Sequence, residues 1–195
     1  MPFFVNTWIK FFVLLTPFFA LSMFVLYTAD RTSQERTKLA LKVTGAVLAV
    51  AVVLFFLGEA IFQVVGITID SFRVGAGALL FLSAVQLVQG GEQAASDQAD
   101  IAVVPLAVPV IVGPATTGAI LIMGAETVGT ARWIALSALV CAIAAIGVLL
   151  LCADLVERLI RRRGIVILSK LTGLVLSALA VQMIFGGARH LIGSN

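Results

Sequence analysis

Two prolines inside strongly apolar segments are the residues of this sequence best placed to build a binding site. Pro17 interrupts the first apolar segment, and Gly113-Pro114 interrupts the fourth. Proline removes a backbone donor and obstructs the carbonyl one turn earlier, so each interruption leaves peptide groups that need other partners. Free amides after Gly113-Pro114 would hold a carboxylate, and freed carbonyls before Pro17 would accept from an ammonium. The pattern favours a small zwitterion, although kinks and small residues also serve close helix packing. The expected lining residues are Thr16, Pro17, Gly113, Pro114, Thr116 and Thr117.

Two glutamines are further candidates for contact with a ligand. Gln86 and Gln182 occupy matching places in the third and sixth apolar segments, where their amides would contact substrate or bond between helices. Soluble-enzyme chemistry is not indicated, because the only histidine is His190 near the end of the chain and no glycine-rich phosphate loop follows a strand. The sequence therefore predicts no catalytic residues, no metal site and no cofactor.

Charged residues near the ends of apolar segments could couple or gate transport. Glu59 and Asp154 follow the second and fifth segments at similar points, so either is a candidate to carry a coupling proton. Arg73 begins the third segment, Lys170 lies near the matching place in the sixth, and both are candidates for an ionic gate. Ordinary solvation and snorkelling at the membrane surface are the alternative role of these four residues.

The composition indicates that this protein lies in a lipid bilayer. Hydrophobic residues make up 61% of the 195 residues and charged residues 12%, with a mean hydropathy of +1.15. A typical soluble domain is roughly half apolar and about a quarter charged. The chain is therefore expected to be an integral membrane protein with the lipid bilayer as its main partner. Its net charge of +3 does not call for a nucleic acid.

Six apolar segments are long enough to be transmembrane helices. Bilayer crossings need about 20 residues, and backbone groups in hydrocarbon must be paired within the segment unless a barrel forms. Strand alternation is absent, so an all-α fold is predicted. The expected spans are 8–28, 39–58, 74–90, 101–123, 134–152 and 165–186, and the expected loops are 29–38, 59–73, 91–100, 124–133 and 153–164.

The distribution of lysine and arginine predicts the orientation. The first and last loops with their flanks carry nine of the 13 basic residues, and cytoplasmic loops retain positive charge. Both termini are therefore predicted outside. The third loop, also on the cytoplasmic side, contains no Lys or Arg.

A weak repeat divides the chain into two halves. Residues 77–91 match residues 173–187 at an offset of 96, with seven of fifteen pairs identical, and Pro17 falls on Pro114 at an offset of 97. We expect a single membrane domain, 1–195, with repeat 1 at about 8–91, a linker at about 92–100 and repeat 2 at about 101–187. Each repeat has three helices, an odd number, so the second is inverted, as in secondary transporters with broken helices at a midplane site. A duplication that no longer transports anything is the alternative.

These motifs resemble those of the MarC family of six-helix membrane proteins, over nearly the full chain. The resemblance rests on the glycine-rich segment 66–77, on Pro105-Leu-Ala-Val-Pro109 with Gly113-Pro114, and on 168–182. Two positions depart from the family pattern: Thr16-Pro17 replaces Asn-Pro, and Ala115 replaces the second glycine of Gly-Pro-Gly. The resemblance implies a bacterial or archaeal inner membrane protein that transports small neutral amino acids such as glycine, alanine or serine, coupled to an ion gradient, most simply protons.

The sequence leaves two other functions open. One is an exporter of amino acids or other metabolites resembling LysE-type carriers, which metabolite accumulation in a deletion strain would reveal. The other is a membrane scaffold or assembly factor, which would show no flux and no polar cavity between the two prolines. The oligomeric state is not predicted.

Overall fold

The computed structural model describes residues 2–89 and 112–193, and every regular element in these ranges is an α-helix. The all-α prediction is therefore confirmed for the described part of the chain. The predicted linker 92–100 and the first half of the predicted fourth helix, with Pro105 and Pro109, lie outside it. The helices are α1 Pro2–Leu14, α2 Pro17–Tyr27, α3 Ser33–Val65, α4 Ile69–Gln89, α7 Pro114–Glu126, α8 Gly129–Leu151 and α9 Ala153–Gly193.

The first predicted span is broken before Pro17, as predicted, into two short helices. α1 has 13 residues and α2 has 11, so at a rise of 1.5 Å per residue they are about 20 and 16 Å long. Neither could cross a hydrocarbon core of about 30 Å alone, whereas together they could. The break between them therefore lies at membrane depth. α7 also has 13 residues, so it too is shorter than a hydrocarbon core of about 30 Å.

Helix α3 is longer than the sequence predicted. Thr32 and Glu35 form a capping box at its start, and Gly66 in the left-handed region ends it. The predicted loop 59–73 is therefore wrong: only residues 66–68 separate α3 from α4. The prediction from hydropathy ended this helix where its polar residues begin. Polar side chains do not stop a helix, whereas a glycine in the left-handed region at its C-terminus does.

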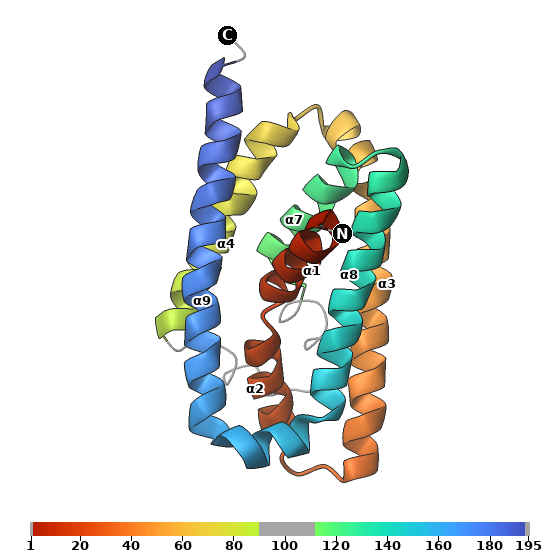
Figure 1. Cartoon of the computed structure of the whole chain (residues 1–195), viewed down its shortest axis with the longest axis vertical. Helices are drawn as coiled ribbons and strands as arrows, with labels where there is room; N and C mark the ends of the chain where they lie inside the picture. Colours follow the sequence, from red (N-terminus) through yellow and green to blue (C-terminus); the bar gives the residue numbers. More distant parts are fainter. Residues whose placement is uncertain (1, 90–111, 194–195) are drawn as a thin grey trace.

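The predicted loop 153–164 is also wrong. Helix α9 begins at Ala153, directly after Cys152, and continues for 41 residues. Figure 1 shows its first turns crossing the lower end of the molecule before the helix turns upward beside α4. Residues 153–164 contain four Arg and two Leu, which are good helix formers, but the charged residues make the segment too polar to count as part of a span.

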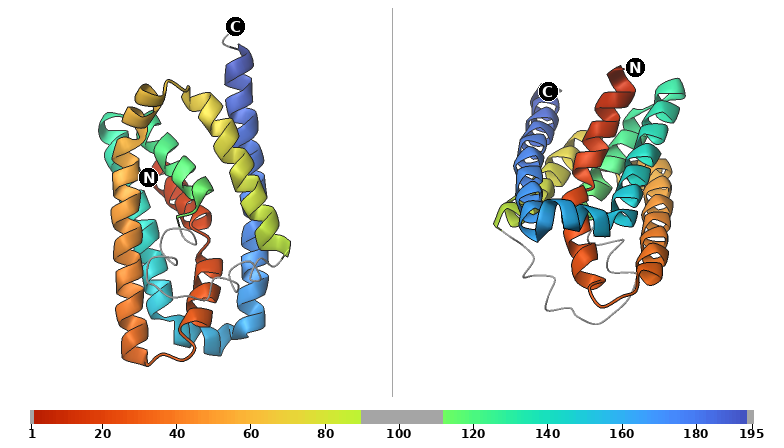
Figure 2. Two further views of the ribbon diagram at one scale, coloured as in Figure 1. Left: turned by 180° about the vertical axis from the view of Figure 1, so that it is seen from behind. Right: turned by 60° about the horizontal axis from the view of Figure 1, so that its bottom comes forward.

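The broken helix lies between two pairs of long helices. α3 packs on α8, and α4 packs on α9. The α1–α2 segment contacts α8 and α9, while α7 contacts α3 and α4, as the view from behind shows (Figure 2). In the apolar window of Pro2–Tyr27, 56% of residues are buried, compared with 22–44% in the other candidate spans. The interrupted helix is thus at the centre of the bundle.

The outer surface of the bundle is apolar. Large hydrophobic side chains such as Val64, Leu159, Ile192 and Phe185 are each more than 70% exposed. A soluble protein rarely exposes apolar patches on this scale, so this surface fits lipid. Five helical segments of the described residues are long and apolar enough to span a membrane: Pro2–Tyr27, Ser33–Val65, Ile69–Gln89, Gly129–Leu151 and Gly164–Gly193.

Candidate functional site

The backbone at the α1–α2 break has an unusual conformation. Thr16 has φ 47° and ψ 60°, the only positive φ of a non-glycine residue in the described ranges. A β-branched residue rarely adopts this region, and such strain costs about 1–3 kcal/mol. Pro17 then begins α2 and is buried. The strained turn is retained because surrounding structure holds it, and backbone strain of this kind concentrates at functional sites.

The second break meets the first. Gly113 is the N-cap of α7, and Pro114 is its first residue. The Thr116 side chain, 5% exposed, donates a hydrogen bond of 3.0 Å to the carbonyl oxygen of Leu14 in the last turn of α1. The two proline breaks are therefore in contact although they are about a hundred residues apart in sequence. Thr117 follows, half-buried, and its amide donates 2.9 Å to the Gly113 carbonyl.

Two helices begin here, α2 at Pro17 and α7 at Pro114. In α2 the Ala20 amide donates to the Thr16 carbonyl, and in α7 the Thr117 amide donates to the Gly113 carbonyl. The amides that precede Ala20 and Thr117 therefore belong to the first turns of these helices. First-turn amides have no intrahelical partner. Neither helix has a side-chain cap. At membrane depth, α2 and α7 thus each present a partial positive charge and free donors.

A cavity of about 330 Å³ extends from this region toward one end of the bundle. Its lining includes Leu14 and Ala119 near the breaks, Gln182 of α9, and the charged Lys10 and Glu126. Ligand pockets commonly occupy about 300–1,000 Å³. The cavity is thus large enough for a small solute. Both predicted glutamines are exposed; Gln182 on α9 contributes to the lining of the cavity, and Gln86 on α4 does not.

Arg73 at the start of α4 connects two helices at that end of the bundle. Its guanidinium contacts Asp70 at 3.3 Å and forms an ion pair with Glu126, the last residue of α7. The sequence named Arg73 as a candidate but not Glu126. No local signal marked Glu126, because its partner is more than fifty residues away.

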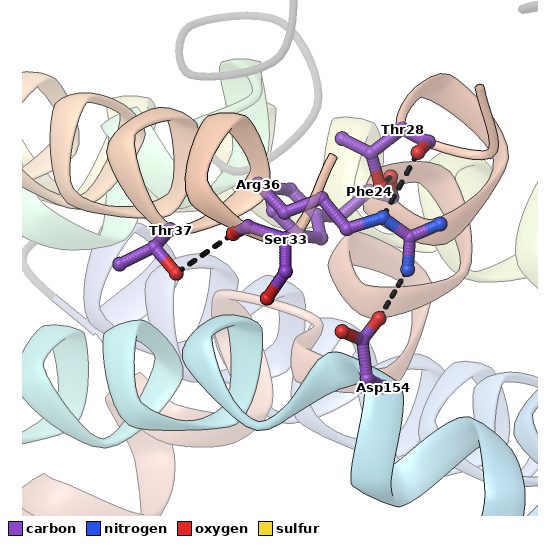
Figure 3. A network of polar contacts seen from close by, with 6 residues as sticks. All are labelled: Phe24, Thr28, Ser33, Arg36, Thr37 and Asp154. Atoms are coloured by element: carbon purple, nitrogen blue, oxygen red, sulfur yellow. Dashed lines mark hydrogen bonds and ion pairs between the residues drawn. The ribbon is translucent and has the colours of Figure 1, made fainter. Parts of the chain in front are cut away.

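A second ion pair lies at the opposite end of the bundle. Asp154 at the start of α9 pairs with Arg36 of α3, and the Arg36 Nε also donates 2.9 Å to the Thr28 carbonyl after α2 (Figure 3). The Thr28 hydroxyl in turn donates 2.7 Å to the Phe24 carbonyl. This network joins α2, α3 and α9. Sequence reasoning named Asp154 but not Arg36.

The remaining candidates lie apart from the breaks. Glu59 is exposed on α3, where its carboxylate accepts a 3.4 Å hydrogen bond from Gln63 one turn later. Lys170 is exposed on α9. Their suggested roles in coupling and gating stay predictions.

Helices α4 and α9 pack antiparallel through glycines. A Cβ added at Gly77 would lie 3.0 Å from the Ala180 carbonyl oxygen, and one added at Gly173 would lie 3.0 Å from the Ala84 carbonyl oxygen. Gly187 in turn approaches the carbonyl of Asp70 at the start of α4. A larger side chain at any of these positions would push the two helices apart.

Comparison with known proteins identifies the family. A family described as MarC family integral membrane protein matches residues 1–192. The chain belongs to the MarC family. A UPF0056 membrane protein of Methanocaldococcus jannaschii is 32% identical over 200 residues, covering 97% of each chain. UPF0056 membrane protein YhcE of Escherichia coli is 29% identical over 205 residues, covering 96% of this chain and 93% of that protein. No solved structure matches this MarC-family chain. It is thus a multi-pass membrane protein of a family found in bacteria and archaea, as the motifs had predicted.

Proposed function

We propose that this protein is a secondary transporter of small neutral amino acids, of the glycine, alanine and serine class, driven by an ion gradient. The observation that carries the proposal is the contact between the α1–α2 break and the start of α7, made by the Thr116 hydroxyl and the Leu14 carbonyl. Interrupted helices are costly in a bilayer, because freed peptide groups must be satisfied by protein, water or a ligand. Two interruptions that meet at membrane depth supply both donors and acceptors for one solute.

The chemistry of the breaks suits a zwitterion. The first turns of α2 and α7 offer amides and partial positive charge to a carboxylate. The last turn of α1 offers carbonyl oxygens to an ammonium, and the Leu14 carbonyl already accepts from the Thr116 hydroxyl. A substrate ammonium would replace that hydroxyl as donor. Thr16, Pro17, Gly113, Pro114 and Thr117 complete the proposed site, and Gln86 and Gln182 remain candidate contacts from α4 and α9.

An inverted repeat is the second part of the proposal, and the α4–α9 contact supports it. The pairs Gly77/Gly173 and Ala84/Ala180 are each related by the offset of 96. Gly77 packs on Ala180, and Gly173 packs on Ala84. Reciprocal contact between equivalent residues is what a two-fold axis between the helices requires. Two three-helix units related in this way could rock about a fixed site.

Ion pairs at the two ends supply candidate gates. Arg73–Glu126 joins α4 to α7 at one end, and Arg36–Asp154 joins α3 to α9 at the other. Alternating access requires that contacts at one end break while those at the other hold. We propose that these pairs exchange in this way in the cytoplasmic membrane, with both termini outside and the Arg36–Asp154 pair inside.

Flux through purified protein tests the proposed function. Proteoliposomes would be assayed for counterflow of labelled glycine, alanine and serine, with and without a proton gradient. Pro114→Ala is expected to abolish flux while expression and monodispersity are retained, and Pro2→Ala at the exposed start of α1 is the matched control. Flux no higher than in empty vesicles for every substrate would exclude the transport function. Normal flux in Pro114→Ala would exclude the broken-helix mechanism.

A further inference from the structure

The cavity beside α1 carries an unmatched charge of each sign. Arg73 is shared between Asp70 and Glu126, so this cluster has one positive and two negative charges, a net charge of −1. Lys10 lines the same cavity, and none of the described residues forms an ion pair with it. Glu126 and Lys10, both exposed, therefore offer one negative and one positive charge at the lining of this cavity.

The rest of the cavity lining is mostly apolar and leads inward. Besides the charged residues and Gln182, the walls are side chains of α1, α7 and α9 such as Leu14 and Ala119. Leu14 is the residue whose carbonyl oxygen accepts from Thr116 at the breaks. A solute held between Lys10 and Glu126 would thus be next to the proposed midplane site. A solute with only one charge would pair with only one of these two exposed groups, whereas a zwitterion would pair with both.

Building on the proposed function, we infer that this cavity is an access site that binds the substrate zwitterion before the midplane site does. Lys10 takes the carboxylate, and Glu126 takes the ammonium in place of one of its contacts with Arg73. Asp70 keeps Arg73 neutralised when Glu126 turns to the substrate. Arrival of the ligand therefore loosens the link between α4 and α7.

Protection of a reporter cysteine inside the cavity tests this site separately from flux. Gln182→Cys is placed in a background with Cys141→Ser and Cys152→Ser, and the protein is reconstituted in phosphatidylcholine nanodiscs. The rate of reaction with an aqueous thiol reagent is measured against alanine, alaninamide, which lacks the carboxylate, and propionate, which lacks the ammonium. Alanine is expected to protect best. Lys10→Met should raise the half-protecting alanine concentration by up to about fivefold, because Lys10 is exposed and an exposed ion pair contributes about 1 kcal/mol at most, and should not change protection by alaninamide.

Arg189→Met is the matched control, because Arg189 is an exposed cation of α9 that is not part of the cavity lining. It should leave the half-protecting concentration unchanged. Normal alanine flux without protection, or equal loss in both variants, would overturn the access site but not the transport function. Protection that depends on Lys10 in a protein without flux would support the site and exclude transport. A Lys10 effect seen only when phosphatidylethanolamine is added would identify a lipid headgroup as the ligand and overturn the proposal.

Discussion

Replacing Thr116 by valine tests whether the bond between the two breaks holds them together. Valine keeps nearly the same shape, so the main change is the loss of the hydroxyl that donates 3.0 Å to the Leu14 carbonyl. A hydrogen bond between transmembrane helices contributes only about 0.6 kcal/mol on average, because its partners can often pair elsewhere. The Leu14 carbonyl is in the last turn of α1, where intrahelical donors are missing.

The expected loss is therefore larger than that average. Leaving a buried acceptor without a donor costs about 1–3 kcal/mol. For a chain of this size, each kcal/mol lowers the melting temperature by about 2–4 °C. Thr116→Val should thus melt about 2–12 °C below the wild type in detergent, measured by a thiol-independent thermal assay such as loss of monodispersity after heating.

Thr116→Ser is the control, because it retains the hydroxyl and loses one methyl group. It should stay closer to the wild type than Thr116→Val does. The reasoning would be refuted if the valine variant were as stable as the wild type, or if serine and valine were equally destabilising. The second result would mean that packing, rather than the hydrogen bond, joins the breaks.

Three further perturbations probe the surrounding fold, each measured by thermal unfolding in detergent. Gly124→Ala should destabilise the protein, because the added Cβ would overlap the backbone of α3. Gly45→Ala has open space and should be neutral or stabilising by up to about 1 kcal/mol. Equal effects of the two substitutions would contradict the close contact between α7 and α3. Arg36→Leu should lower the free energy of unfolding by about 1 kcal/mol more than Asp154→Asn does, because it also removes the hydrogen bond to the Thr28 carbonyl after α2. Equal losses of stability would assign the whole effect to the ion pair. Thr32→Ala removes the capping box of α3 and should cost about 0.5–2 kcal/mol; no loss would mean that the cap is dispensable.

The sequence by itself determined the membrane environment, the helical class, the break at Pro17 and the helix start at Pro114. Long apolar runs specify bilayer spans because hydrophobic length must match the membrane, and proline interrupts a helix wherever it occurs inside one. Both effects are local, so composition and spacing were enough. Helix ends were harder to predict. The full length of α3 and of α9 was missed because charged turns continue a helix while lowering its hydropathy.

Only the tertiary structure decided which of these residues meet. The Thr116–Leu14 bond, the Arg73–Glu126 pair and the Arg36–Asp154 pair each join helices that are far apart in sequence. No local pattern encodes such contacts, because they depend on which faces of the helices pack together. The same packing gathers charges of both signs around one cavity, a feature that neither hydropathy nor motif spacing could reveal.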